Sequence, residues 1–175
     1  MTSARDWSRL PAPQDDGGAR HLDGAILPAI PLPGTNGEMI TLSALPGLTV
    51  VYAYPRTAGP DGAVPDGWDA IPGARGCTPQ SCAFRDHFAE LRRLGVSHLF
   101  GLSTQDTAYQ REAAQRLHLP FPLLSDALLA FEAGGMTLLK RLTLLVRDGR
   151  VVRVFYPVFP PDCSAADVLA WLREA

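Results

Sequence analysis

The stretch IPGARGCTPQSCAFRDHFAEL, residues 71–91, carries two cysteines at the start of a predicted helix. Cys77 ends a loop rich in Pro and Gly, and Cys82 follows five residues later. Beyond them, apolar residues recur every three or four positions between charged ones, which predicts an amphipathic helix that extends to about Gly95. Thr78 or Cys77 itself would cap this helix, which places the Cys77 thiol at its N-terminus. The free backbone N–H groups and the positive end of the helix dipole at that terminus would favour the thiolate form of Cys77. We interpret the stretch as a reactive cysteine followed by a resolving thiol.

The composition is that of an ordinary globular domain. The chain has 175 residues, of which 46% are hydrophobic, and its formal net charge is −2 at pH 7. This length suits one domain with a sizeable core, and the charge lacks the basic excess of a nucleic-acid-binding protein. No apolar run is long enough to span a membrane, and the polar N-terminus does not resemble a signal peptide, so we expect a cytoplasmic protein. Because thiols are kept reduced there, its three cysteines favour catalysis or metal binding over structural disulfides.

The order of the predicted elements is that of an α/β domain. Residues 1–20 lack periodicity and are expected to form a flexible tail, which leaves 21–175 as a single domain. A turn at residues 35–37 predicts an N-terminal hairpin, and residues 56–75 form a long loop rich in Gly, Pro and Asp. Strands are predicted at residues 48–54, 96–102, 138–146 and 150–156, and helices at 107–118 and 165–174, the last capped by Ser164; residues 121–133 are ambiguous. The order β-α-β-α-β-β-α predicts a mixed sheet flanked by helices on both faces.

Several separated motifs, in this order, resemble the peroxiredoxin family. The pattern Gly-Cys-Thr-x-x-x-Cys-x-Phe-Arg-Asp at residues 76–86 is similar to that of the Q-type, or bacterioferritin comigratory protein, branch. The other matching motifs are Tyr54-Pro55, Gly101-Leu102-Ser103, the sequence LPFPLLSD at 119–126, and Arg141 ahead of Asp148-Gly149. The resemblance covers roughly residues 22–175. It implies a thioredoxin-like fold and the thiol-dependent reduction of hydrogen peroxide and organic hydroperoxides.

The resemblance also implies a role for each matching residue. Cys77 corresponds to the peroxidatic cysteine and Cys82 to the resolving one, whereas Arg141 corresponds to the arginine that stabilises the thiolate and the departing oxygen. Pro55 corresponds to the proline that shields the thiolate. The implied partners are a peroxide and a thioredoxin-type reductant, with no cofactor. Resolution within one chain needs no second subunit, so we expect a monomer or a weak homodimer.

Three features depart from the family pattern. The family has Thr or Ser three residues before the peroxidatic cysteine, and this chain has Ala74 there. Residues 56–75 contain an apparent insertion between Pro55 and the reactive cysteine, and Thr57 within it is an alternative source of the hydroxyl that orients the peroxide. Residues 127–137 look shorter than the corresponding family segment.

Helix geometry sets a condition on any disulfide between the two thiols. Residues five apart in an intact α-helix have Cα atoms roughly 8–9 Å apart, whereas a disulfide requires less than about 7 Å. We therefore expect the first turns of the helix to unwind after Cys77 is oxidised.

Other interpretations stay open at this point. Cys82 could be a plain helix-surface thiol, Arg141 a solvated strand charge and Cys163 an incidental residue. A zinc site that uses Cys77, Cys82 and His87 has too few ligands at suitable spacing. On the same fold, the thiol pair could serve a redox sensor or binding module with little turnover. A general thiol–disulfide oxidoreductase typically has two residues between its thiols, whereas four intervene here.

Overall fold

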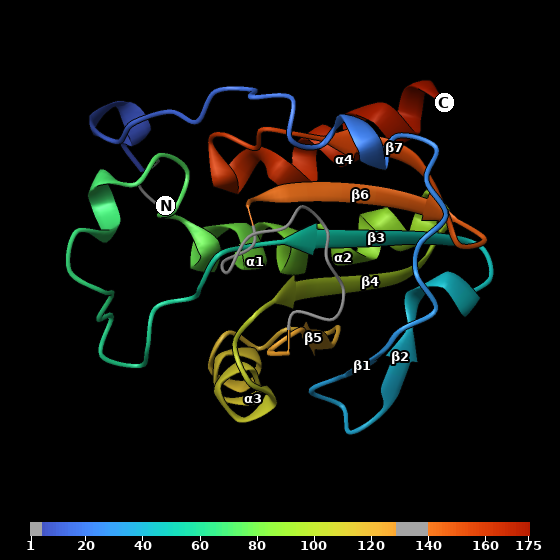
Figure 1. Ribbon diagram of the computed structural model, residues 1–175, viewed down its shortest axis with the longest axis horizontal. Coiled ribbons are helices and arrows are strands. Elements are labelled where there is room, and N and C mark those ends of the chain that lie inside the picture. The colour runs from blue at the N-terminus through green and yellow to red at the C-terminus, as the bar shows by residue number, and fades with distance from the viewer. Residues whose placement is uncertain (1–4, 129–139) are drawn as a thin grey trace.

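A five-stranded sheet forms the centre of the protein in the computed structural model, which describes residues 5–128 and 140–175 (Figure 1). The strand order is β5-β4-β3-β6-β7. The bounds are β3 Leu48–Ala53, β4 Val96–Ser103, β5 Leu123–Ser125, β6 Leu142–Arg147 and β7 Arg150–Phe155. Strands β3, β4 and β5 run parallel, whereas β6 is antiparallel to β3 and β7 is antiparallel to β6. The predicted mixed sheet is therefore confirmed.

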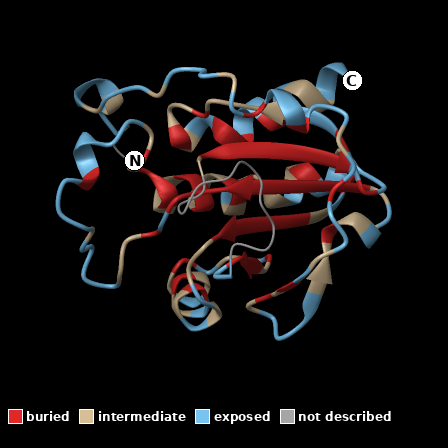
Figure 2. Ribbon diagram, viewed as in Figure 1, coloured by how far each residue is buried: buried red, intermediate tan, exposed pale blue. Residues whose placement is uncertain are grey.

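Strand β3 is the buried centre of this sheet. Its sequence LTVVYA is rich in β-branched and aromatic residues, and every position is buried. Val50 and Tyr52 face one hydrophobic cluster, whereas Val51 and Ala53 face the other, as the two-residue period of a strand requires. Figure 2 shows buried residues along β3, β4 and β6, whereas the loop that precedes Cys77 is largely exposed.

Helices α1 (Cys77–Asp86), α2 (Phe88–Arg93) and α4 (Ser164–Glu174) contribute to the hydrophobic cluster on the Tyr52 face. The Phe84 ring stacks on the Tyr52 ring at 4.5 Å between centroids. Helix α3 (Thr107–Arg116) lies along β5, where the Gln110 amide donates to the Leu124 carbonyl over 2.8 Å. These contacts fix the direction of α1 and place its first residue at the carboxyl end of β3.

The opposite face is covered by the N-terminal part of the described chain. The hairpin of β1 (Pro31–Pro33) and β2 (Met39–Thr41) forms at the predicted turn, in antiparallel register. Two short 3₁₀ helices, Arg20–Leu22 and Leu42–Ala44, contribute Leu22 and Leu42 to this cluster. The sheet is thus flanked on both faces, by α-helices on one and by short 3₁₀ helices and the hairpin on the other.

The structure differs from the sequence-based expectations at several boundaries. The single helix predicted from Cys77 to Gly95 is divided at His87, whose backbone (φ −99°, ψ 5°) leaves the helical region. The division gives the two aromatic rings separate partners, because Phe88 packs on Phe121 while Phe84 packs on Tyr52.

The two helix caps were predicted wrongly. Gly76 is the N-cap of α1 in place of Thr78 or Cys77, and its φ of 109° favours glycine. Ser164 lies inside α4 instead of capping it, because its hydroxyl contacts Gln80 and Thr143.

The ambiguous region 121–133 contains strand β5. Of the strand predicted at 138–146, residues 138 and 139 lie outside the described ranges, and β6 spans Leu142–Arg147. The apparently short segment 127–137 lies for the most part outside the described residues.

Residues 5–20 contact the rest of the domain through side chains that include Trp7 and Asp16. The Trp7 indole donates to Asp162 over 3.0 Å and its ring packs edge-on against Phe159. Asp16 accepts hydrogen bonds from Tyr156 and from Lys140. The flexible tail at residues 1–20 stays a prediction, although part of that segment is tied to the surface of the fold. Within the described ranges, no helix combines the length and apolar character that a membrane crossing requires.

Candidate active site

Cys77 is the first residue of α1, directly after the turn that closes the long loop. A Cβ atom at Gly76 would lie 2.5 Å from the Pro161 ring and 2.9 Å from the Trp7 ring. Close packing and the left-handed backbone together therefore require glycine before the cysteine. The helix begins where the chain approaches the end of β3, so the Cys77 sulfur meets the backbone that leaves that strand.

Two N–H donors converge on the Cys77 sulfur. The Arg141 guanidinium donates through Nη2 over 3.2 Å, and the backbone N–H of Arg56 donates over 3.3 Å. As a thiol, Cys77 can donate to the Ala74 carbonyl, 3.6 Å away. Its side chain is only 2% exposed, yet the residue lines a cavity of about 240 Å³. The sulfur thus belongs to a residue that is covered from bulk water and lines a cavity, and it has donors placed to stabilise a negative charge.

Arg141 is buried, with 4% of its surface exposed. The register of β3 and β6 pairs Ala53 with Leu142, so Arg141 lies beside the chain that leaves β3. Its guanidinium also donates to the carbonyls of the turn before Cys77: Gly73 (3.2 and 3.3 Å), Ala74 (3.0 Å) and Arg75 (3.2 Å). These contacts exclude the interpretation of Arg141 as a solvated strand charge and show that it holds both the sulfur and the turn.

Gln80 is a member of the site that the sequence analysis missed. It is fully buried, accepts a hydrogen bond from Arg141 Nη1, and donates to Ser164 Oγ over 3.3 Å. Ser164 Oγ in turn lies 3.0 Å from Thr143 Oγ1. The only local signal was the position of Gln80 three residues after Cys77, which puts the two on neighbouring positions of one helix face.

The strand end around Pro55 supplies the second wall of the site. Pro55 is buried and fixes the backbone just before the Arg56 N–H that reaches the sulfur. Thr57 is 1% exposed, and within the described part of the chain its hydroxyl has no hydrogen-bond partner. Its backbone is held at both ends, because its N–H donates to Gln105 Oε1 over 3.3 Å and its carbonyl accepts from the Tyr109 hydroxyl over 2.7 Å. An unpaired buried hydroxyl therefore lies one residue from a donor to the sulfur.

All three cysteines are free thiols. Cys82 is half-buried on the intact α1, so the helix separates it from Cys77 by about one and a half turns. Cys163 is exposed at the end of the 3₁₀ helix Pro161–Cys163. Partial desolvation, together with the Asp162 and Asp167 carboxylates, raises the pKa of the Cys163 thiol.

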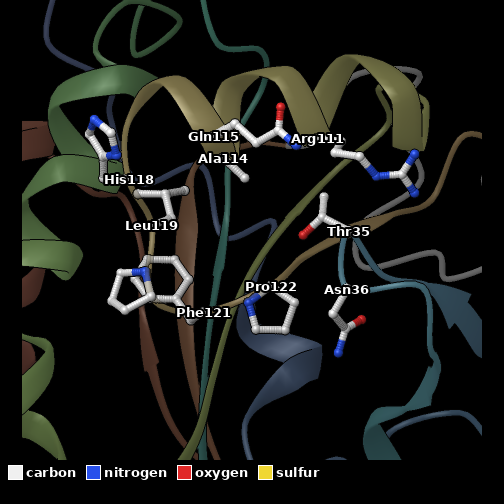
Figure 3. Close-up of a pocket in the computed structure, with 10 residues that line it drawn as sticks. Thr35, Asn36, Arg111, Ala114, Gln115, His118, Leu119, Phe121 and Pro122 are labelled. Atoms are coloured by element: carbon white, nitrogen blue, oxygen red, sulfur yellow. The ribbon is translucent and has the colours of Figure 1, made fainter.

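Two further observations define the surroundings. Over the described ranges, no three His, Cys, Asp or Glu side chains gather in a group that could hold a metal ion, and this includes the set of Cys77, Cys82 and His87. A separate cavity of about 590 Å³ lies between the end of α3 and the turn of the β1–β2 hairpin (Figure 3). Its lining includes Arg111 and His118 but no cysteine, so it does not belong to the site around Cys77.

Comparisons with known proteins agree with this geometry. A model of the Redoxin family matches residues 22–170. The chain is 36% identical over 165 residues to peroxiredoxin Bcp of Escherichia coli K12, which covers 86% of this chain and 95% of that protein. It is 32% identical over 109 residues to the chloroplastic peroxiredoxin Q of Suaeda salsa; that match covers 62% of this chain but only 44% of the relative, so the aligned part spans less than half of its length.

A solved structure with a similar fold comes from the same group of proteins. The crystal structure of peroxidoxin BcpB from Mycobacterium tuberculosis matches with a TM-score of 0.70 and 28% identity, over 87% of this chain and 96% of that one. This match confirms the predicted thioredoxin-like architecture. The chain therefore belongs to the peroxiredoxin family, in the branch that contains peroxiredoxin Q and Bcp.

Proposed function

We propose that the protein is a thiol peroxidase that reduces hydrogen peroxide and organic hydroperoxides with Cys77 as its nucleophile. The observation that carries the proposal is the convergence of the Arg141 guanidinium and the Arg56 N–H on one sulfur. Both groups favour the thiolate, the form of a cysteine that attacks peroxides. Pro55 supports this arrangement by fixing the backbone ahead of Arg56.

The first step transfers one oxygen atom to sulfur. The Cys77 thiolate attacks the terminal peroxide oxygen, an S–O bond forms, and the O–O bond breaks as the sulfur loses two electrons. The other oxygen leaves as hydroxide or alkoxide and takes up a proton, which gives water or an alcohol. Arg141 and the Arg56 N–H stabilise the negative charge that moves from sulfur to the leaving oxygen. Thr57 is the group that we assign to orient the peroxide, because its buried hydroxyl is unpaired and follows Arg56 directly.

The second step joins the sulfenic acid of Cys77 to a thiol and releases water. We assign Cys82 to this step, since it lies on the same helix and is half-buried. The intact helix keeps the two residues too far apart for a disulfide, so α1 must unwind from Gly76 through at least its first turns. This opening would also expose the Cys77 sulfur, which is almost completely covered in the folded form.

A thioredoxin-type dithiol would return the disulfide to two thiols by exchange. The exposed, unwound segment gives that reductant access to the sulfur atoms. A cycle that starts from free thiols suits the reducing cytoplasm, and resolution within one chain suits a monomer or a weak homodimer.

The proposal is tested by steady-state consumption of hydrogen peroxide with thioredoxin, thioredoxin reductase and NADPH. We expect turnover in the wild type, none in Cys77→Ser, and loss of thioredoxin-dependent turnover in Cys82→Ser. Cys163→Ser is the matched control, because it removes a thiol outside the site, and it should retain turnover. Activity that survives in Cys77→Ser would refute the assignment of the nucleophile. Slow peroxide reduction together with fast reduction of insulin disulfides would favour a general thiol–disulfide oxidoreductase instead.

A further inference from the structure

The cavity at Cys77 is lined by four arginines and by no acidic residue among those the structure describes. Arg5, Arg56, Arg75 and Arg116 line it together with Cys77 and the first residues of α1. Apolar wall comes from Val64 and from Trp68, whose side chain is buried at 4% exposure. A cavity of about 240 Å³ with this lining offers positive charge and a small apolar surface beside the reactive sulfur.

The four arginines come from three separate parts of the chain. Arg56 and Arg75 lie near the two ends of the long loop between β3 and α1, Arg116 is the last residue of α3, and Arg5 belongs to the N-terminal segment. The folded arrangement therefore concentrates like charges at one opening, although bringing like charges together costs free energy. A ligand of opposite charge would offset that cost.

Two of the arginines already have carboxylate partners and two do not. Arg75 pairs with Asp69 at 2.9 Å, and Arg116 pairs with Glu112 at 2.7 Å. Neither Arg5 nor Arg56 forms an ion pair with any residue in the described ranges. The Arg56 guanidinium instead lies over the Tyr109 ring, 5.1 Å from its centroid, which positions the side chain without neutralising its charge.

We propose that this cavity binds the anionic group of the substrate, so that the preferred peroxides are short organic hydroperoxides that carry a carboxylate a few bonds from the O–O bond. This inference rests on the proposed peroxidase function and adds a substrate class to it. Arg56 is the central anion-binding residue: it lines the cavity, its backbone N–H contacts the sulfur, and its guanidinium has no ion pair within the described residues. The carboxylate is bound and stays unchanged; the hydroperoxide is reduced to the alcohol as the Cys77 thiolate is oxidised to the sulfenic acid.

A cluster of arginines that only stabilised the thiolate would act differently. It would speed the reaction with every peroxide by a similar factor, charged or neutral. A binding site for the anionic group would instead speed the reaction of anionic peroxides selectively, and added salt would weaken that selectivity. The ratio of kcat/KM between a charged substrate and its neutral analogue separates the two.

The experiment compares the terminal hydroperoxide of hexanoate with its methyl ester. We expect wild-type kcat/KM to favour the carboxylate by about tenfold, the scale of one charge-assisted hydrogen bond. Arg56→Gln keeps the backbone N–H that contacts the sulfur and should bring the ratio close to one. Arg111→Gln is the matched control, because it removes an exposed arginine that lines the separate cavity of Figure 3, and its ratio should equal that of the wild type.

Three results would overturn the proposal. They are a wild-type kcat/KM ratio near one, a ratio that Arg56→Gln leaves unchanged, and a ratio that Arg111→Gln lowers as much as Arg56→Gln does. Hydrogen peroxide, which is small and uncharged, is measured alongside. If the protein reduces hydrogen peroxide through Cys77 but shows no preference for the carboxylate, only the anion site fails. If it reduces none of the three compounds, the peroxidase function itself fails.

Discussion

Substituting Arg141 with methionine removes the guanidinium but keeps an unbranched side chain, and we expect it to lower both activity and stability. In the folded protein this guanidinium contacts the Cys77 sulfur at 3.2 Å and three turn carbonyls at 3.0–3.3 Å. A hydrogen bond to a charged group is worth about 1.5–3 kcal/mol. Since about 1.4 kcal/mol corresponds to a factor of ten, kcat/KM for hydrogen peroxide should fall about 10- to 100-fold.

The loss of stability has a separate origin. Removing Arg141 leaves the carbonyls of Gly73, Ala74 and Arg75 and the buried Gln80 side chain with fewer donors. At about 1–3 kcal/mol for each buried group left unpaired, and with the turn partly open to water, the free energy of unfolding should fall by about 2–4 kcal/mol. Arg141→Lys is the informative second variant. It keeps the charge but cannot reproduce the planar fork, so stability should fall as in the methionine variant while activity falls less.

Two assays separate these effects. Urea unfolding gives the free energy of unfolding, and stopped-flow oxidation of the reduced protein gives the rate constant for hydrogen peroxide under conditions in which each variant is fully folded. Should folded Arg141→Met react within twofold of the wild-type rate constant, the role assigned to the guanidinium would be incorrect.

Three further predictions test other contacts of the site. Thr57→Val removes a buried hydroxyl that has no hydrogen-bond partner within the described residues, so the free energy of unfolding should be unchanged or slightly higher. The rate constant for peroxide should fall at least about tenfold, and an unchanged rate constant would remove Thr57 from the mechanism. Gly76→Ala places a methyl group 2.5 Å from Pro161 and 2.9 Å from Trp7 at a residue with positive φ. Thermal unfolding should therefore show a decrease of about 2–4 kcal/mol in the free energy of unfolding, and an unchanged stability would contradict the described packing. The pKa of Cys163 is raised by partial desolvation and by nearby carboxylates, so its alkylation by iodoacetamide at neutral pH, mapped by peptide mass spectrometry, should be slower than that of free cysteine. Labelling faster than that of free cysteine would contradict the raised pKa.

The features that could be predicted from sequence are those with local causes. The run LTVVYA identifies a strand buried on both faces, and the apolar spacing after Cys77 identifies a helix. Arg141 alone gave no clear signal from its own neighbours. Its place in the order of peroxiredoxin motifs pointed to the site, and the structure brings it to the sulfur.

The features that could not be predicted depend on contacts between distant segments. Gln80 and Ser164 are 84 positions apart and meet only because α1 and α4 pack on the same face of the sheet. The Arg56 N–H reaches the sulfur because the chain that leaves β3 passes beside the first residue of α1. A pattern of side chains in the sequence does not identify such a backbone donor. Trp7 packs beside Gly76 although the sequence around it has no periodicity.

The most direct test mixes the fully reduced protein with one equivalent of hydrogen peroxide, quenches it with acid, and maps the products by thiol counting and mass spectrometry. We expect the rapid loss of two thiols, a disulfide that joins Cys77 to Cys82, and in Cys82→Ser a single added oxygen on Cys77. The account is contradicted if thiols are lost at the same rate in Cys77→Ser, or if the first oxygen is found on Cys163.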